Sequence, residues 1–468
     1  MLNKTGTLAG RFCTLCAICF CAVILIQNIL RLPAGQPVVV LAGLLAGCVV
    51  LALCLRYLRP FRGFGVALFL ARFVLALCFI LWLGSEPVQD FATMYAAAEQ
   101  LAAGSHEYLN NIYFFNWAYQ SAFVAYEAVV IALFGNSLFP LQLLNALWLA
   151  GTNVLVYALA KRFLPERAAM TAGVLYCIYP APLFLAGVLT NQHLSAFLLY
   201  SALYLLLSRR ISPLRALGAG ALIALGNAMR PIGVIVMLAA VLWLLIRSVH
   251  RAQLRDALHG GCVAISYFLV GAALSGLIVS SGINPEGLSN NQPMWKFVVG
   301  LNQDSNGSWN RADYEAYLSL PTQEGHQAMT QAVLERLSVG PAKLAGLVWR
   351  KSAVMWAGNE DLYWGFGHLK QDAPAIAGLS WNSLQLLLGS FDKGIYLLAF
   401  GLAFLGLLTR LRSPERCGRS LSLVLLLCGY YAVHLIVEVQ SRYRYFLMPC
   451  IFILGAMTLA HLLPKERT

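Results

Sequence analysis

Apolar runs of about 20 residues, separated by short polar links, recur along most of this chain. A helix of that length crosses the hydrocarbon core of a bilayer. The pattern therefore predicts an all-α polytopic membrane protein with about twelve transmembrane helices. The expected spans cover residues 12–30, 37–55, 65–83, 138–160, 168–188, 193–208, 213–229, 232–247, 260–281, 392–410, 420–437 and 444–463.

The stretch SAFVAYEAVVIALFG, residues 121–135, is apolar but too short to cross a bilayer, and it carries Glu127. If it did cross, the basic link KRFLPER would face the outer side, whereas basic links prefer the cytoplasmic side. We therefore expect this stretch to lie flat on the outer surface as an amphipathic helix.

The first apolar run follows a basic start that contains Lys4 and Arg11, as a signal peptide does. The run is long for the apolar part of a signal peptide, and RLPAGQ after it offers no A-x-A cleavage site. We expect a retained signal anchor.

The composition indicates that lipid is the main solvent of this chain. Of its 468 residues, 59% are hydrophobic and only 11% are charged, whereas about a quarter of a soluble domain is charged. The net charge of +13 is spread over short links rather than gathered on one soluble face, which argues against nucleic acid as a partner. With the N-terminus inside, every inner link is net basic, as topology rules require. These links are RYLRPFRG, KRFLPER, SRRISPLR, IRSVHRAQLR, TRLRSPERCGR and the tail PKERT.

Two longer polar stretches are expected on the outer side. Residues 84–137 follow the third span and are acidic, and residues 282–391 are the only part that could form a small external lobe. The expected organisation is an N-terminal transmembrane region (1–281, with the first external loop at 84–137), an external and juxtamembrane segment (282–391) and a C-terminal transmembrane region (392–468).

Polar side chains gather at the outer ends of spans that are far apart in sequence. An ionisable group at membrane depth costs about 3 kcal/mol, so such groups line a cavity or pair with one another. A carboxylate can take a proton from a hydroxyl, and arginines can hold an anionic leaving group such as phosphate. The candidates are Asp90, Asn191, Gln192, His193, Asn227, Arg230, Glu438, Gln440, Arg442 and Arg444.

The long outer segment contains further candidates for a sugar or acceptor pocket, namely Lys296, Asp304, Trp309, Asn310 and Asp313. Aromatic and amide side chains suit sugars. They equally suit a loop at the membrane interface, so both interpretations stay open.

The stretch PVQDFATMYAAAEQLAAG after the third span resembles the first external loop of GT-C-fold membrane glycosyltransferases, which include protein O-mannosyltransferases and the lipid A aminoarabinose transferase. The resemblance continues, in the same order, through YFFNWAYQSAFVAYEAVVIALFGNS, LTNQHLSAFLL, GNAMRPIGVIV and EVQSRYRYFLMPCIFILGA. It implies a transfer of sugar from a polyprenyl-phosphate donor to an envelope acceptor (glycolipid, glycan or protein) on the extracytoplasmic face. It also favours the bacterial cytoplasmic (inner) membrane, with both termini in the cytoplasm.

The resemblance implies roles for individual residues. Asp90 matches the catalytic acid-base position. Binding of the donor phosphate is assigned to Arg230, Arg442, Arg444 and Lys296. Substrate-binding roles are assigned to Asn191, Gln192, His193, Glu438, Trp309 and Asn310.

The sequence departs from that family at two points that concern metal binding. Phe91 follows Asp90 where many relatives have a second acidic residue, and TNQH stands where a further carboxylate is often found. One histidine with amides is a poor ligand set for Mg²⁺ or Mn²⁺, which prefer carboxylate oxygens. No cofactor is therefore certain, and a divalent metal remains an open alternative.

Simpler interpretations compete with each assignment. Asp90 could cap a helix that starts at Phe91, Arg230 could reach lipid phosphate, and Glu438 could pair with Arg442 four residues on. For the whole chain, the alternatives are a lipid-linked glycan flippase or transporter, an O-antigen ligase or polymerase, and a scaffold without activity.

Overall fold

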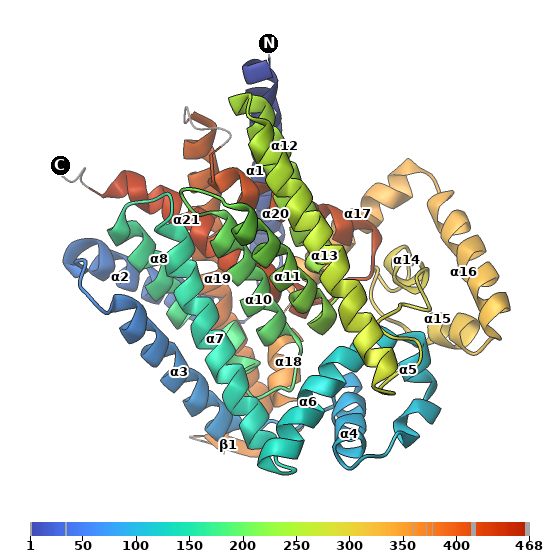
Figure 1. Ribbon diagram of the computed structural model, residues 1–468. Helices are drawn as coiled ribbons and strands as arrows, with labels where there is room; N and C mark the ends of the chain where they lie inside the picture. Colours follow the sequence, from blue (N-terminus) through green and yellow to red (C-terminus); the bar gives the residue numbers. More distant parts are fainter. Residues whose placement is uncertain are drawn as a thin grey trace.

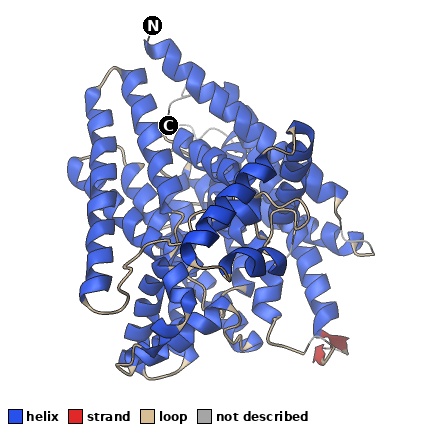
Figure 2. Ribbon diagram, turned by 90° about the vertical axis from the view of Figure 1, so that its right-hand side faces the viewer, coloured by secondary structure: helices blue, strands red, loops and turns tan. Residues whose placement is uncertain are grey.

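The computed structural model describes residues 2–32, 35–358, 360–370, 372–376, 378–412 and 418–463. Within these ranges the chain is almost entirely helical, as Figure 2 shows. The strands found there are β1 (Pro374–Ile376) and β2 (Leu379–Ser380), which pair as a small antiparallel hairpin. The all-α fold class is confirmed.

Eight helices in the described residues are long and apolar enough to cross a membrane. The protein is thus an integral, multi-pass membrane protein. The eight are α1 (Leu2–Leu30), α2 (Pro37–Tyr57), α3 (Phe64–Leu83), α7 (Leu138–Ala160), α12 (Gly233–Arg251), α13 (Leu254–Ser280), α19 (Trp381–Arg412) and α21 (Met448–Leu462), the last preceded by the 3₁₀ helix η4 (Ser441–Leu447).

The expected count of twelve spans is not confirmed. Three expected spans are helices of 15 to 17 residues: α10 (Gln192–Leu206), α11 (Pro213–Met229) and α20 (Ser420–Ile436). The run expected at 168–188 is not one helix, because α8 (Glu166–Ile178) stops before Pro180 and only α9 (Ala181–Phe184) follows. Proline lacks a backbone N–H and clashes with the preceding turn, so the expectation of an unbroken span was wrong here.

The remaining helices belong to the two stretches expected outside. Figure 1 shows α4 and β1 at the lower end of the molecule, opposite the start of α1 and the turn between α12 and α13. The helix α19 begins at Trp381, so the boundary expected at residue 391 falls inside it. These helices are α4 (Asp90–Ala102), η1 (Glu107–Asn110), α5 (Ile112–Asn116), η2 (Ala118–Gln120), α6 (Ser121–Phe134), α14 (Trp295–Gly300), α15 (Arg311–Asp313), the π-helical turn η3 (Tyr314–Leu318), α16 (Thr322–Leu337), α17 (Pro341–Ala357) and α18 (Glu360–Phe366).

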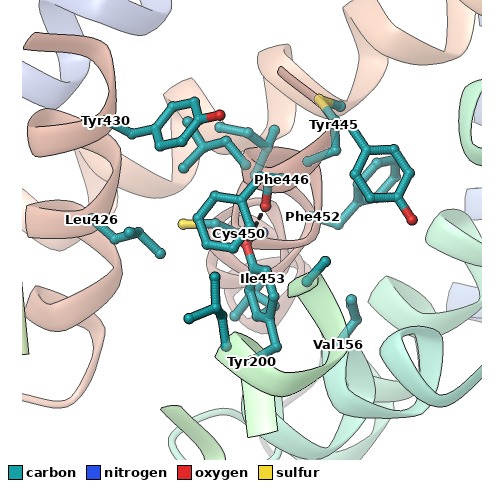
Figure 3. Close-up of a cluster of buried hydrophobic side chains, with 14 of the residues drawn as sticks. Val156, Tyr200, Leu426, Tyr430, Tyr445, Phe446, Cys450, Phe452 and Ile453 are labelled. Carbon is teal, nitrogen blue, oxygen red and sulfur yellow. Dashed lines mark hydrogen bonds between the residues drawn. The ribbon is translucent and has the colours of Figure 1, made fainter. Parts of the chain in front are cut away.

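The start of α21 is anchored in the main apolar core. The Tyr200 hydroxyl donates to the backbone oxygen of Phe446 at 2.9 Å and accepts from the Cys450 N–H at 3.0 Å (Figure 3). Buried side chains of other helices surround this pair of bonds, including Val156 and Leu426. The link that precedes α21 is therefore held firmly at its inner end.

An irregular segment, residues 179–191, which contains only the short helix α9, runs through the buried part of the bundle. Backbone groups at membrane depth need partners inside the protein, and side chains of neighbouring helices supply them. Arg72 donates to the oxygens of Cys177 and Tyr179 at 2.7 and 3.2 Å. Asn145 donates to the oxygens of Ala186 and Val188 at 3.3 and 2.9 Å.

Three more side chains complete this support. Gln142 donates to the oxygen of Gly187 at 2.9 Å. His193 bonds the oxygen of Leu185 at 2.8 Å through Nε2. Asp392 accepts the N–H of Ala181 at 2.9 Å. The segment is thus a built part of the fold and fixes the position of Asn191 at its end.

Candidate active site

Asp90 is the first residue of α4 and its side chain is exposed. Within the described residues its carboxylate has no hydrogen bond and no ion pair. It therefore does not cap a helix that starts at Phe91, which was the simpler alternative. The positive end of α4 also stabilises a negative charge at this position. The Asp90 carboxylate is therefore a charged group that is exposed and has no partner among the described residues.

Arg442, on η4, lies beside the residue that follows Asp90. Its guanidinium carbon is 5.1 Å from the ring centre of Phe91 and 4.1 Å from that of Trp364 on α18. Its Nε donates to the side-chain oxygen of Gln440 at 2.6 Å. Its Nη1 is buried and has no hydrogen-bond partner among the described residues. A cation with an open donor thus lies next to the Asp90 loop.

The charges of Asp90 and Arg442 both affect the pKa of Tyr113, on α5. Burial raises the pKa of Tyr113 well above its usual value, and the charge of Asp90 raises it further. Arg442 and a hydrogen bond with Gln120 act on this pKa in the opposite direction. The charges of Asp90 and Arg442, which come from two distant links, therefore both act on the Tyr113 hydroxyl.

Arg230, which ends α11, approaches the same place from another helix. Its Nη1 donates to Asn191 Oδ1 at 3.0 Å, and Asn191 Nδ2 donates to Gln120 Oε1 at 3.3 Å. Its guanidinium carbon is 5.0 Å from the ring centre of Tyr443, and that of Arg442 is 6.0 Å from the same ring. Both guanidinium groups therefore contact one tyrosine.

Lys296, on α14, forms an ion pair with Glu438. The backbone supports this pair, because the Glu438 N–H donates to the Lys296 oxygen at 2.8 Å. Close approach requires glycine at position 300, where an added Cβ would lie 2.3 Å from the oxygen of Ile436. The carboxylate of Glu438 also accepts from Gln440 at 2.8 Å, so the pair is linked to Arg442 through an amide.

The ion pair keeps both partners charged. Burial by itself raises the pKa of Glu438, but Lys296 outweighs burial and the pKa is lowered overall. Burial likewise opposes the charge of Lys296, and Glu438 raises the pKa of Lys296 in spite of it. The alternative in which Glu438 pairs with Arg442 is wrong, because Glu438 pairs with Lys296 instead.

Two positive charges at this site are left without a carboxylate. Five ion pairs occur among the described residues, and neither Arg230 nor Arg442 belongs to any of them. The residues that the structure brings together are thus Asp90, Asn191, Arg230, Lys296, Glu438 and Arg442, which we call the outer cluster.

Three expected residues point elsewhere. A 3₁₀ helix turns about 120° per residue, so Arg444 leaves η4 on a different side from Arg442. Arg444 donates to the oxygen of Gly358 at 2.7 Å, beyond the end of α17. His193 is buried between Leu185 and the Tyr445 hydroxyl, which lies 2.7 Å from its Nδ1. Gln192 is buried at the start of α10, and its Nε2 has no partner among the described residues.

Trp309 and Asn310 serve the outer segment itself. Asn310 caps α15 by accepting the N–H of Asp313 at 2.8 Å, and it donates back to that carboxylate at 2.9 Å. Asp313 is also paired with Arg336. Trp309 is half exposed and packs near Tyr314. None of these contacts reaches the outer cluster.

No group of three or more His, Cys, Asp or Glu side chains that could hold a metal ion occurs in the part of the chain that the structure describes. In the outer cluster, Glu438 is occupied by Lys296. Asp90 is then the one free carboxylate described for the cluster, which is a poor ligand set for a hard cation.

Comparison with known proteins bears on the same region. Residues 123–275 match the model of the dolichyl-phosphate-mannose-protein mannosyltransferase family. This match confirms the resemblance to GT-C membrane glycosyltransferases. It covers about a third of the chain and contains Asn191 and Arg230, but neither Asp90 nor Arg442.

The crystal structure of ArnT from Cupriavidus metallidurans bound to undecaprenyl phosphate is similar over 86% of this chain and 79% of that chain, with 15% identity and a TM-score of 0.37. A likeness at this TM-score supports no inference about this chain. No curated protein sequence matches this chain.

Several residues of the site were not expected from the sequence. These are Tyr113, Gln120, Trp364 and Tyr443, which contact the outer cluster or connect its members. Aromatic and amide residues are common in loops at a membrane surface, so their types alone did not distinguish them. A useful signal was available for Tyr443, which lies between Arg442 and Arg444 in the sequence.

Proposed function

We propose that this protein is a membrane glycosyltransferase that takes a sugar from a polyprenyl-phosphate donor and transfers it to a hydroxyl of an envelope acceptor. The observation that carries the proposal is the pair of arginines around Tyr443, neither of which has a carboxylate partner among the described residues. A free carboxylate, Asp90, lies at the start of α4, next to the Phe91 ring that Arg442 contacts.

The charges suit departure of a phosphate. When the sugar leaves its carrier, the bond between the anomeric carbon and the phosphate oxygen breaks and its electron pair stays on the phosphate. Arginine presents donors in a planar fork that matches phosphate oxygens. Arg442, with its unpartnered Nη1, and Arg230 would stabilise the negative charge that develops there.

The carboxylate suits activation of the acceptor. As the acceptor oxygen forms its bond to the anomeric carbon, its proton must leave. Asp90 has no competing partner among the described residues, so it can accept that proton as a general base. The sugar and the acceptor are assigned only by class: an activated monophosphate sugar and a hydroxyl of a glycolipid, glycan or protein.

Lys296 and Glu438 have a different role in this proposal from the one expected at first. Their ion pair neutralises one charge and, through Gln440, fixes the Nε side of Arg442. The opposite side of the guanidinium then stays available for the donor. We assign them to holding Arg442 in place rather than to contact with substrate.

The test is a turnover measurement on purified full-length protein with a panel of polyprenyl-phosphate sugars. Wild type should release free polyprenyl phosphate from at least one donor in the presence of an acceptor extract. Asp90→Asn should reduce turnover roughly 10²- to 10⁴-fold, the usual contribution of a general base.

Glu86→Gln is the matched control, since Glu86 is an exposed acid on the same loop and should retain full turnover. Equal turnover by wild type and Asp90→Asn would remove Asp90 from the mechanism. Movement of a lipid-linked glycan across vesicles without sugar transfer would instead favour a flippase.

A further inference from the structure

The residue before Asp90 has a backbone conformation that favours glycine. Gln89 has φ 52° and ψ −128°, close to the first central position of a type II′ turn, which glycine normally occupies. The turn is closed by the Phe91 N–H, which donates to the oxygen of Val88 at 3.1 Å. A side chain in this region of φ and ψ is strained, and such strain concentrates at functional sites.

The strain at Gln89 differs from that at another non-glycine residue with positive φ. Ala252, at the end of α12, has φ 52° and ψ 42°, which is the ordinary left-handed region found at many helix ends. Gln89 lies outside that region because its ψ is −128°, of opposite sign to the ψ of Ala252. Ala252 therefore offers a natural comparison at the opposite end of the molecule.

The loop that carries Gln89 is held by α18 and by the residues that follow it, up to His368. The Gln89 amide donates to the Tyr363 hydroxyl at 3.4 Å. The Ser85 hydroxyl donates to the oxygen of Gly365 at 3.1 Å, and His368 Nε2 bonds the oxygen of Leu83 at 3.0 Å. Three contacts from residues 363–368 thus hold the loop before and at the turn.

A close backbone approach makes this clamp rigid. An added Cβ at Gly365 would lie 2.2 Å from the oxygen of Phe184. On the other side, Trp364 packs edge-on against Phe91 at 5.2 Å and lies under the guanidinium of Arg442. The same segment therefore fixes both the turn before Asp90 and the arginine beside it.

We infer that Gln89 is a positioning residue, whose strained turn and amide contact with Tyr363 hold the Asp90 carboxylate in the orientation that activates the acceptor. This inference rests on the proposed function. Glycine would adopt the turn with less strain. Glutamine at this position therefore lowers stability, and in return its amide contact fixes the orientation of the Asp90 carboxylate. The strain persists because α18 and the residues that follow it hold the loop before and at the turn.

The test compares Gln89→Gly with wild type in thermal unfolding and in turnover kinetics. Relief of strain should leave the melting temperature unchanged or raised, because glycine adopts this conformation freely. Loss of orientation should lower kcat roughly 10- to 100-fold, since small misplacement of a reacting group has effects of that size. The KM for the donor should change less than twofold, because the arginines are untouched.

Two further variants make the result decisive. Tyr363→Phe removes only the hydroxyl that receives the Gln89 amide, and it should lower kcat in the same direction by a smaller factor. Ala252→Gly relieves positive φ far from the site and should leave kcat unchanged.

Each outcome has one meaning. Wild-type kcat in Gln89→Gly, with Asp90→Asn inactive, overturns the positioning role and leaves the proposed function intact. A parallel loss of stability and kcat in Gln89→Gly also overturns it, because the turn would then be purely structural. Absence of turnover by wild type overturns both proposals.

Discussion

Two regions of this protein contain buried polar side chains, and they use them in opposite ways. Around the irregular segment 179–191, Asn145, Gln142 and His193 direct hydrogen bonds to backbone oxygens of the segment itself. In the outer cluster, Arg230 and Arg442 belong to no ion pair among the described residues, and Nη1 of Arg442 has no partner there.

The difference teaches how to separate structure from chemistry in a membrane protein. A polar group in lipid is costly wherever it occurs, so its burial alone does not indicate a site. Groups whose bonds end on the backbone of their own fold are explained by the fold. Groups that keep an unused donor or charge call for a ligand. Arg72 lies between these cases, since it holds two carbonyls while its Nε and Nη2 have no partner among the described residues.

The largest effect on stability is expected from the segment's support. Asn145→Leu leaves the buried oxygen of Ala186 without a donor, at about 1–3 kcal/mol. It also removes one of the two donors of the Val188 oxygen, which still accepts the Thr190 N–H at 2.7 Å, at about 1 kcal/mol. We expect a loss of about 2–4 kcal/mol in the free energy of unfolding, measured by thermal or denaturant unfolding in detergent. The folded fraction should bind polyprenyl phosphate as wild type does.

Asn136→Leu is the matched control for that experiment. Asn136 also makes two side-chain hydrogen bonds, to Tyr95 and Glu99, but in an exposed position. Its loss should be within about 1 kcal/mol. Equal losses in the two variants would show that the segment does not depend on buried donors.

A smaller effect, on pH dependence, should come from the ion pair that supports the outer cluster. Because the pKa of Glu438 is lowered from its usual 4.5, its contribution to stability is complete above that pH and is lost as pH falls through the lowered value. Lys296, whose pKa is raised from 10.5, contributes fully below 10.5 and loses its contribution at higher pH.

Glu438→Gln should remove the acidic part of this profile. The difference in melting temperature between wild type and the variant should be constant near neutral pH and should shrink below about pH 4.5. A difference that stays constant as the pH is lowered to 3 would contradict the assigned charge of Glu438.

The sequence predicted the class of the fold but not its interruptions. Apolar runs indicated a multi-pass helical protein because lipid requires such runs in every span. The break after α8 was missed even though Pro180 and Pro182 mark it. The irregular segment is stable only because side chains from α3, α7, α10 and α19 reach it, and such long-range contacts are not visible in one sequence.

The candidate site was predictable in part for the same reason. Topology placed Asp90, Arg230 and Arg442 on one side, and the structure brings them together. The sequence did not predict that Lys296 pairs with Glu438, 142 residues away. Nor did it predict that the 3₁₀ helix directs Arg444 away from Arg442. Pairing and rotation of single side chains depend on packing, which spacing along the chain does not specify.

The central claim is that the outer cluster binds a phosphate because two of its arginines have no carboxylate partner. The most direct test is equilibrium binding of polyprenyl phosphate, and of the matching uncharged polyprenol, to purified wild type, Arg442→Gln and the exposed control Arg311→Gln. Wild type and Arg311→Gln should prefer the phosphate, and Arg442→Gln should bind it roughly 10- to 150-fold more weakly, as loss of a charged hydrogen bond of about 1.5–3 kcal/mol requires. Equal affinity of wild type for phosphate and alcohol, or unchanged phosphate affinity in Arg442→Gln, would contradict the account.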